Sequence, residues 1–137
     1  MEESTIIDLI FDLQKKYSVE NDTFISELNI SQAEYNMFIC LKNCKHFNSY
    51  SVSEKMNLSL SRVSRIIDKM VNKSYLTRTT NKIDRRAIDI KMTTKGKGIL
   101  EKIVIYTKER ETQLEEQLTD AEYAEIKSCF KKLIKIS

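Results

Sequence analysis

The first and last thirds of the chain have apolar residues at spacings of three and four. This pattern is typical of amphipathic helices that turn one face toward a core or a partner. It predicts a helix from Met1 to Tyr17, which residues 19–30 extend before a loop. It also predicts a long helix from Thr93 to about Gln117 and a last helix after Thr119. The chain has no Pro and only two Gly, which favours helices further.

Three Ser/Thr-x-x-Glu sequences have the form of capping boxes, which satisfy free amides at helix N-termini. They begin at Ser31, Ser51 and Thr119. The first predicts a helix to about Cys44. The second predicts a short helix to about Asn57, after a connection over residues 46–50.

A further helix is expected after Ser59, a plausible N-cap residue. The residues expected to point inward from it are Val63, Ile66, Ile67 and Met70. Two short helices separated by about three residues form a helix-turn-helix.

Residues 75–92 have a different pattern. Ile88, Ile90 and Met92 alternate with polar residues, and a charged turn over residues 81–86 precedes them. A period of two predicts strands, so we expect a β-hairpin here. The predicted fold is mainly α with a small β-hairpin wing: a winged helix-turn-helix in a single domain over residues 1–137.

The net charge of +3 is unevenly distributed. Residues 59–98 carry eleven Lys or Arg and three Asp, whereas the rest of the chain has 12 basic and 17 acidic residues. A basic centre between acidic ends suits a phosphate backbone as partner. Its alternative is a solvated charged face.

On the helix after Ser59, the apolar positions leave a polar outer face of hydroxyls and cations. Small hydroxyls allow a helix to lie deep in a major groove, and Arg can donate two bonds to guanine. The hydroxyls of Ser59 and Ser61 at the helix start suit phosphate oxygens. The alternative is again a solvated face. The outer-face residues are Ser61, Arg62, Ser64, Arg65 and Lys69.

The turn of the hairpin presents Lys82, Arg85 and Arg86, which have no place in a core. An Arg at such a tip can enter a narrow minor groove, where the negative potential is deepest. Alternatively, Asp84 and Arg86 pair only to stabilise the turn, which contributes less than about 1 kcal/mol at a surface.

Four blocks of sequence resemble the MarR (multiple antibiotic resistance regulator) family. They are residues 61–70 (SRVSRIIDKM), 76–78 (LTR), 84–86 (DRR) and 92–96 (MTTKG), in the family's order and at its spacing. The chain departs from the pattern at Ser74, where the family usually has Gly before the wing, so Ser74 or Asn72 must end the helix. Met92 replaces the usual Leu, and Glu54-Lys55-Met56 replaces a common Leu-Ala pair.

The resemblance implies that Arg86 enters the minor groove and that Asp84 orients it, with Arg85 as a substitute or a phosphate contact. It also implies a homodimer through both termini. Residues 31–92 would form the DNA-binding lobe, with residues 1–30 and 93–137 as dimerisation helices. A monomer that folds its own ends together is the alternative. The residues expected at the interface are Ile6, Leu9, Ile10, Leu13, Tyr123, Ile126, Phe130, Leu133 and Ile134.

The three cysteines do not suggest a disulfide framework. Cys40 and Cys44 lie four apart with His46 beyond, too few ligands to predict a metal site. We expect Cys40 and Cys44 to be buried packing residues and Cys129 to be a small core or interface residue, with thiol sensing as an alternative. The chain lacks a Gly-rich phosphate loop and a convincing nucleophile–base pair, so no enzyme, cofactor or catalytic residue is predicted.

The sequence therefore predicts a cytoplasmic, homodimeric regulator that binds double-stranded DNA, with no membrane association. As the resemblance implies, it represses transcription from a pseudo-palindromic operator and responds to a small aromatic or anionic effector. Two alternatives stay open. One is a thiol- or metal-responsive sensor on the same scaffold, and the other is a winged-helix module that binds an acidic protein.

Overall fold

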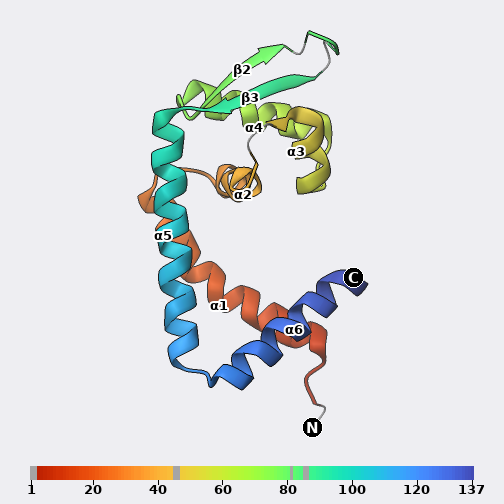
Figure 1. Ribbon diagram of the computed structural model, residues 1–137, viewed down its shortest axis with the longest axis vertical. Helices are drawn as coiled ribbons and strands as arrows, with labels where there is room; N and C mark the ends of the chain where they lie inside the picture. The colour runs from red at the N-terminus through yellow and green to blue at the C-terminus, as the bar shows by residue number, and fades with distance from the viewer. Residues whose placement is uncertain (1–2, 45–46, 81, 85–86) are drawn as a thin grey trace. The chain divides into compact units, whose positions relative to one another are not determined.

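The computed structural model describes residues 3–44, 47–80, 82–84 and 87–137. The chain divides into two compact units, residues 1–100 and 101–137. The first unit holds helices α1 to α4, a three-stranded sheet and the start of α5, and the second holds the rest of α5 and α6 (Figure 1). The predicted fold class, mainly helical with a small hairpin wing, is confirmed.

Helix α1 (Ile6–Glu27) begins at a capping box that the sequence analysis missed. The Thr5 amide donates to the Asp8 carboxylate at 2.9 Å, and the Asp8 amide donates to the Thr5 hydroxyl at 3.1 Å. The backbone hydrogen bond from Thr5 is the main reason that the pKa of Asp8 is lowered. The predicted start at Met1 was therefore too early, whereas the expected extension beyond Tyr17 is confirmed.

Helix α2 (Gln32–Leu41) begins at the predicted Ser31 box, in which the Ser31 amide donates to Glu34 at 2.9 Å. The helix ends at Leu41 and not at Cys44. The Lys42 amide donates to the Ile39 carbonyl, and the Cys44 amide donates to the Leu41 carbonyl. Each of these hydrogen bonds spans three residues, so the chain leaves the α-helical repeat in a tighter turn.

The Glu34 carboxylate is only 2% exposed and is paired with Lys73, the residue that follows helix α4 (Leu60–Asn72). Lys73 Nζ donates to Glu34 Oε1 at 2.7 Å. Burial raises the pKa of Glu34, but hydrogen bonds from Lys73 and Ser31 outweigh it and hold the pKa below its ordinary value. The other oxygen, Oε2, is buried without a hydrogen-bond partner among the described residues. Lys73 therefore supplies the charge that makes this burial tolerable.

The Ser51 capping box was wrong. Helix α3 (Ser49–Met56) is capped by Asn48, whose side chain accepts from the Ser51 amide at 2.9 Å. Ser51 is the third helical residue, and its hydroxyl accepts from the Asn48 amide at 3.1 Å. Asn is as good a cap as Ser, and Asn48 is already extended because it ends a strand.

The expected connection over residues 46–50 was also wrong in part. Strand β1 (Phe47–Asn48) and the start of α3 occupy residues 47–50, while His46 lies outside the described residues. Three residues separate α3 from α4, as predicted for a helix-turn-helix.

The predicted hairpin is confirmed as strands β2 (Leu76–Thr80) and β3 (Ile88–Met92), paired antiparallel. β1 adds to the free side of β3, which gives the order β1-β3-β2. The sequence did not predict this third strand, because two residues are too few to show a period. Ser49 is fully buried, and its hydroxyl accepts from the Ile88 amide at 3.0 Å, so the start of α3 is bound to the wing.

Of the two residues expected to end α4, Ser74 and Asn72, the structure places Ser74 in this role. Its φ of 66° lies in the left-handed region, which usually favours glycine.

Helix α5 (Thr94–Glu116) starts against the backbone of Tyr75. The Tyr75 carbonyl accepts from the Thr93 amide at 3.0 Å. The Thr93 hydroxyl donates to the Ser74 carbonyl at 2.6 Å, with the Tyr75 carbonyl at 3.1 Å as the weaker acceptor, and it accepts from the Gly96 amide at 3.0 Å. A Cβ at Gly96 would collide with the Tyr75 carbonyl oxygen. This contact explains why Thr and Gly stand three apart here.

In the second unit, the predicted Thr119 box opens helix α6 (Asp120–Ile136). The Tyr123 hydroxyl donates to Glu111 of α5 at 2.5 Å, and this bond raises the pKa of Tyr123 to about 12. The α5–α6 turn is therefore held by a cap at its base and by one hydrogen bond between the helices.

Gly96→Ala should lower the free energy of unfolding by about 1–3 kcal/mol, since the added methyl group must displace backbone atoms. Urea unfolding followed by circular dichroism measures it. Gly98→Ala is the matched control, because a Cβ there meets nothing within 4 Å. It should stabilise the exposed helix by about 0.5–1 kcal/mol. Equal effects at the two glycines would contradict the close contact.

Lys73→Met should destabilise the protein by about 2–4 kcal/mol at pH 7, because it leaves the buried Glu34 carboxylate unpaired. In the wild type this pair stabilises the fold above the ordinary pKa of Glu34, and that contribution is lost as the pH falls through the lowered folded pKa. The cost of the variant should therefore shrink below about pH 4.5. Urea unfolding across pH measures it, with the exposed Lys69→Met as control. A cost independent of pH would contradict this account.

Candidate nucleic-acid interface

Helix α4 separates its side chains into two faces. Val63, Ile67 and Met70 are fully buried, and Ile66 is half-buried. The predicted outer face is turned to solvent, since Ser61, Arg62, Arg65 and Lys69 are exposed and Ser64 is half-buried. The helix thus presents three cations and small hydroxyls on one side, as an element that enters a major groove requires.

Ser59 caps this helix as predicted, and its hydroxyl accepts from the Arg62 amide at 3.2 Å. The hydroxyl is thereby engaged within the helix, whereas its own exposure leaves one lone pair open to solvent. The exposed Ser61 lies one residue inside the same helix end, beside the partial positive charge of the helix dipole.

The sequence analysis missed an ion pair between Asp68 of α4 and Arg78 of β2. Both side chains are about half exposed, so the pair adds little stability by itself. It does join α4 to β2, the first strand of the wing, and cancels the one negative charge of α4. No helical or strand spacing could have revealed it, because the two residues lie ten apart on different elements.

The predicted tip residues are described only in part. Lys82 is exposed and Asp84 is half-buried, with the Asp84 carbonyl accepting from the Ala87 amide at 3.0 Å. Arg85 and Arg86 lie outside the described residues, so their predicted groove contacts stay predictions. The tip also carries Ile83, which is 98% exposed and was not singled out from the sequence.

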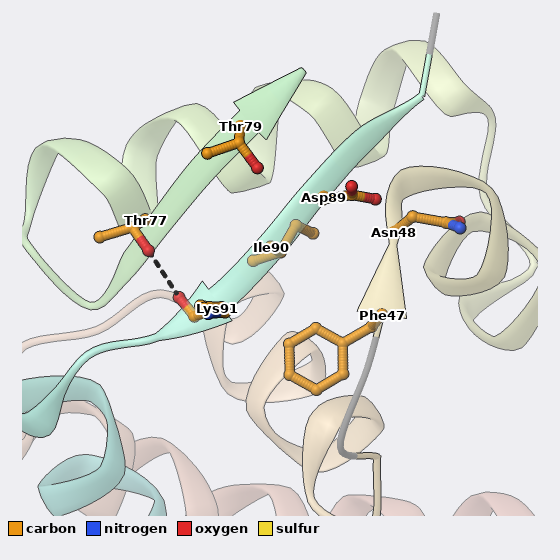
Figure 2. Close-up of a pocket in the computed structure, with 7 residues that line it drawn as sticks. All are labelled: Phe47, Asn48, Thr77, Thr79, Asp89, Ile90 and Lys91. Carbon is orange, nitrogen blue, oxygen red and sulfur yellow. Dashed lines mark hydrogen bonds between the residues drawn. The ribbon is translucent and has the colours of Figure 1, made fainter. Parts of the chain in front are cut away.

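A shallow pocket of about 420 Å³ lies on the wing sheet. Figure 2 shows that its seven lining residues come from three adjacent strands and that the Thr77 hydroxyl bonds the Lys91 carbonyl. Asp89, opposite Thr79 in the register, contributes a carboxylate to this face. A carboxylate repels phosphate, so this pocket is a poor place for a duplex backbone.

Helices α1 and α6 carry the predicted dimerisation residues. On α1, Ile6, Leu9 and Leu13 are exposed and Ile10 is half-buried. On α6, Ile126, Phe130 and Ile134 are exposed, while Tyr123 and Leu133 are half-buried. The sequence analysis missed the exposed Ile7 and Phe11, because these fall outside its single helical stripe.

Cys40 and Cys44 are half-buried, and Cys129 is exposed. Within the described ranges, no cluster of three or more His, Cys, Asp or Glu side chains is arranged for a metal ion. In the same part of the chain, none of the helices has both the length and the apolar character needed to cross a bilayer.

Known proteins resemble this chain over nearly all its length. The model of the MarR family matches residues 30–88. The multiple antibiotic resistance protein MarR of Escherichia coli (strain K12) is 25% identical over 122 residues, which are 88% of this chain and 84% of that protein. The HTH-type transcriptional regulator BilQ of Clostridioides difficile (strain CD3) is 20% identical over 86% of this chain and 80% of its own length.

The fold is that of solved winged-helix structures. The crystal structure of the S. aureus MepR–DNA complex superposes with a TM-score of 0.84 at 18% identity, over 97% of this chain and 98% of that one. The fold is therefore shared over nearly the whole chain, and one of the two relatives, BilQ, is an HTH-type transcriptional regulator.

Proposed function

We propose that this chain, which is similar to the MarR family over residues 30–88, is a winged helix-turn-helix transcription regulator that binds double-stranded DNA sequence-specifically as a homodimer. It would occupy a pseudo-palindromic operator and so repress transcription. Residues 31–92 would form the DNA-binding lobe, and residues 1–30 and 93–137 the dimerisation helices.

The outer face of α4 is the observation that carries this proposal. Its exposed Arg62, Arg65 and Lys69 stand on a helix whose opposite side is fully committed to the core. Arg65 lies in the middle of the helix, where a side chain reaches base edges when the helix enters a major groove. Ser59 and Ser61 lie at its N-terminus, where amides and hydroxyls suit phosphate.

The wing supplies the second set of contacts. Arg86 would enter the minor groove beside the α4 site, and Asp84 would orient it. Lys82 and Arg85 would contact phosphates on either side. The Asp68–Arg78 pair supports this arrangement, because it joins the wing to the helix that reads the major groove.

An effector would act on the first unit near the start of α5. The family resemblance suggests a small aromatic or anionic molecule. Its binding would change the spacing between the two recognition helices, which must match successive major grooves for both to bind.

The DNA contacts are tested with a duplex selected from a random library by the purified protein. Arg86→Ala should weaken binding to all sequences by about 1–2 kcal/mol, whereas Arg65→Ala should cost about 1–3 kcal/mol on the selected sequence and relax base preference. Fluorescence anisotropy over a salt series measures both, with Lys108→Ala of α5 as control. If both variants bind as the wild type does, the proposed contacts are wrong.

The same salt series tests the rival function, a module that binds an acidic protein. Duplex binding that neutralises several phosphates must fall steeply with salt concentration. Wild-type protein that ignores the duplex at low ionic strength would favour the rival.

The dimer is supported by α6, since none of its seventeen residues is buried in the single chain and Ile134 is 76% exposed. Phe130→Glu should weaken the dimer at least about tenfold, because it places a charge within the apolar contact. Sedimentation velocity measures the change. Ser128→Glu, a polar position on the other side of the helix, is the matched control. A wild-type protein that sediments as a monomer at micromolar concentration would refute the interface.

A further inference from the structure

A second pocket, of about 490 Å³, lies in the first unit between the end of α2, strands β1 and β3 and the start of α5. Its apolar lining consists of Leu41, Phe47, Met92 and Leu100. Its cations are Lys42, Lys91 and Lys97, with no carboxylate among the described lining residues. An apolar floor under a cationic rim fits a small molecule that has an apolar body and an anionic group.

Cys44 lines the same pocket and has an ammonium group next to its sulfur. Lys55 Nζ of α3 lies 2.7 Å from Cys44 Sγ. This hydrogen bond is the main reason that the pKa of Lys55 is raised. The Cys44 thiol also donates to the Cys40 carbonyl at 3.9 Å. A neighbouring cation and access to a cavity are features of the surroundings in which cysteines react.

Cys40, one turn earlier, differs from Cys44 in the two features that matter. Burial raises the pKa of the Cys40 thiol, the nearby Lys55 opposes this and Cys44 adds to it. Cys40 is not among the described pocket-lining residues. Cys44 lines the pocket and contacts Lys55 Nζ, so the chain offers a natural comparison between two neighbouring cysteines.

We propose that Cys44 is a covalent modification site for small anionic enones, that is, α,β-unsaturated carbonyl compounds that carry a carboxylate. The lysine rim binds the carboxylate, the apolar floor binds the rest of the molecule, and Lys55 holds the attacking sulfur. This deepens the effector part of the proposed function and, in its consequence for DNA, rests on it.

The reaction is a conjugate addition that needs no further reagent. The Cys44 sulfur forms an S–C bond to the β-carbon as its S–H proton passes to water, and the C=C π electrons move toward the carbonyl group. The α-carbon then takes a proton from water, which leaves a thioether in place of the thiol. The adduct thereby replaces the group that Lys55 contacts.

The consequence reaches the DNA-binding elements through α3. Lys55 belongs to α3, which packs against α4. Cys44 also lies three residues before Phe47, which shares the pocket and stands in β1 next to the Asn48 cap of α3. An adduct in this pocket is therefore expected to displace the start of α3 and lower duplex affinity.

The test uses trans-3-benzoylacrylate and its neutral carboxamide on the full chain, with labelling followed by intact mass and peptide mapping. The rate of labelling by the acid is divided by the rate of labelling by the amide, both at Cys44 and for free glutathione. The ratio at Cys44 should be about ten times the glutathione ratio. Lys97→Met should reduce this ratio, while Lys55→Met should slow both reagents at Cys44. Lys108→Met should change neither, and Cys40 should label more slowly than Cys44 in every variant.

Several results would overturn the site. They are labelling of Cys40 as fast as Cys44, a normalised charge ratio of one, or rates at Cys44 that Lys55→Met leaves unchanged in a protein with wild-type circular dichroism. Labelling is scored without DNA, so its failure leaves duplex binding by α4 intact, and failure of duplex binding leaves the labelling result intact. Adducts that lower affinity for the selected duplex in wild type but not in Cys44→Ser support the coupling. Unchanged affinity in the modified wild type overturns it.

Discussion

The carbonyl oxygen of Tyr75 is the point on which the first unit depends. It accepts from the Thr93 amide, and a Cβ at Gly96 would collide with it. The Thr93 hydroxyl donates mainly to the neighbouring Ser74 carbonyl, and more weakly to that of Tyr75. Tyr75 follows the left-handed Ser74 that ends α4, and it precedes β2 by one residue. The two residues Ser74 and Tyr75 therefore end α4, lead into the wing and receive the first turn of α5. Because all three elements meet at these residues, a shift of the wing along α4 would disturb the start of α5.

Much of this fold was predictable from local patterns. Capping boxes at Ser31 and Thr119, the Ser59 cap and the period-two hairpin were all found where the sequence placed them. These features are determined by residues within a few positions of one another. The start of α3 was misplaced because Asn48 and Ser51 both satisfy the local rule, and the choice between them depends on pairing of β1 with β3, forty residues away. The contacts Glu34–Lys73 and Ser49–Ile88 join residues far apart in the sequence, so no local periodic pattern predicts them.

The exposed face of α4 could be predicted from the helical period. Successive residues are rotated by about 100° around the helix axis, so burial of Val63, Ile67 and Met70 determines which residues of α4 face solvent. The Asp68–Arg78 pair could not be predicted from the helical period, because Arg78 belongs to another element. Asp68 adds a negative charge to a face that would meet phosphate, and only an arginine from another element compensates it. The cationic character of this face is therefore a property of α4 and β2 together. The structural role of Arg78, within the Leu-Thr-Arg block, is to keep it so.

The two units differ in how completely they bury their own apolar residues. Around α2, α4 and the sheet, the largest side chains have no solvent contact, so this part of the chain closes a core by itself. Helix α6 has the opposite character, because all its apolar side chains retain solvent contact and even Phe130 is about half exposed. Burying one such side chain contributes about 1.5–3 kcal/mol. The burial free energy of several such side chains on one helix is therefore comparable with the whole net stability of a domain. A second copy of the chain, offering the same helices, is the partner we propose for them, and the two-fold symmetry of such a dimer would match that of a palindromic duplex.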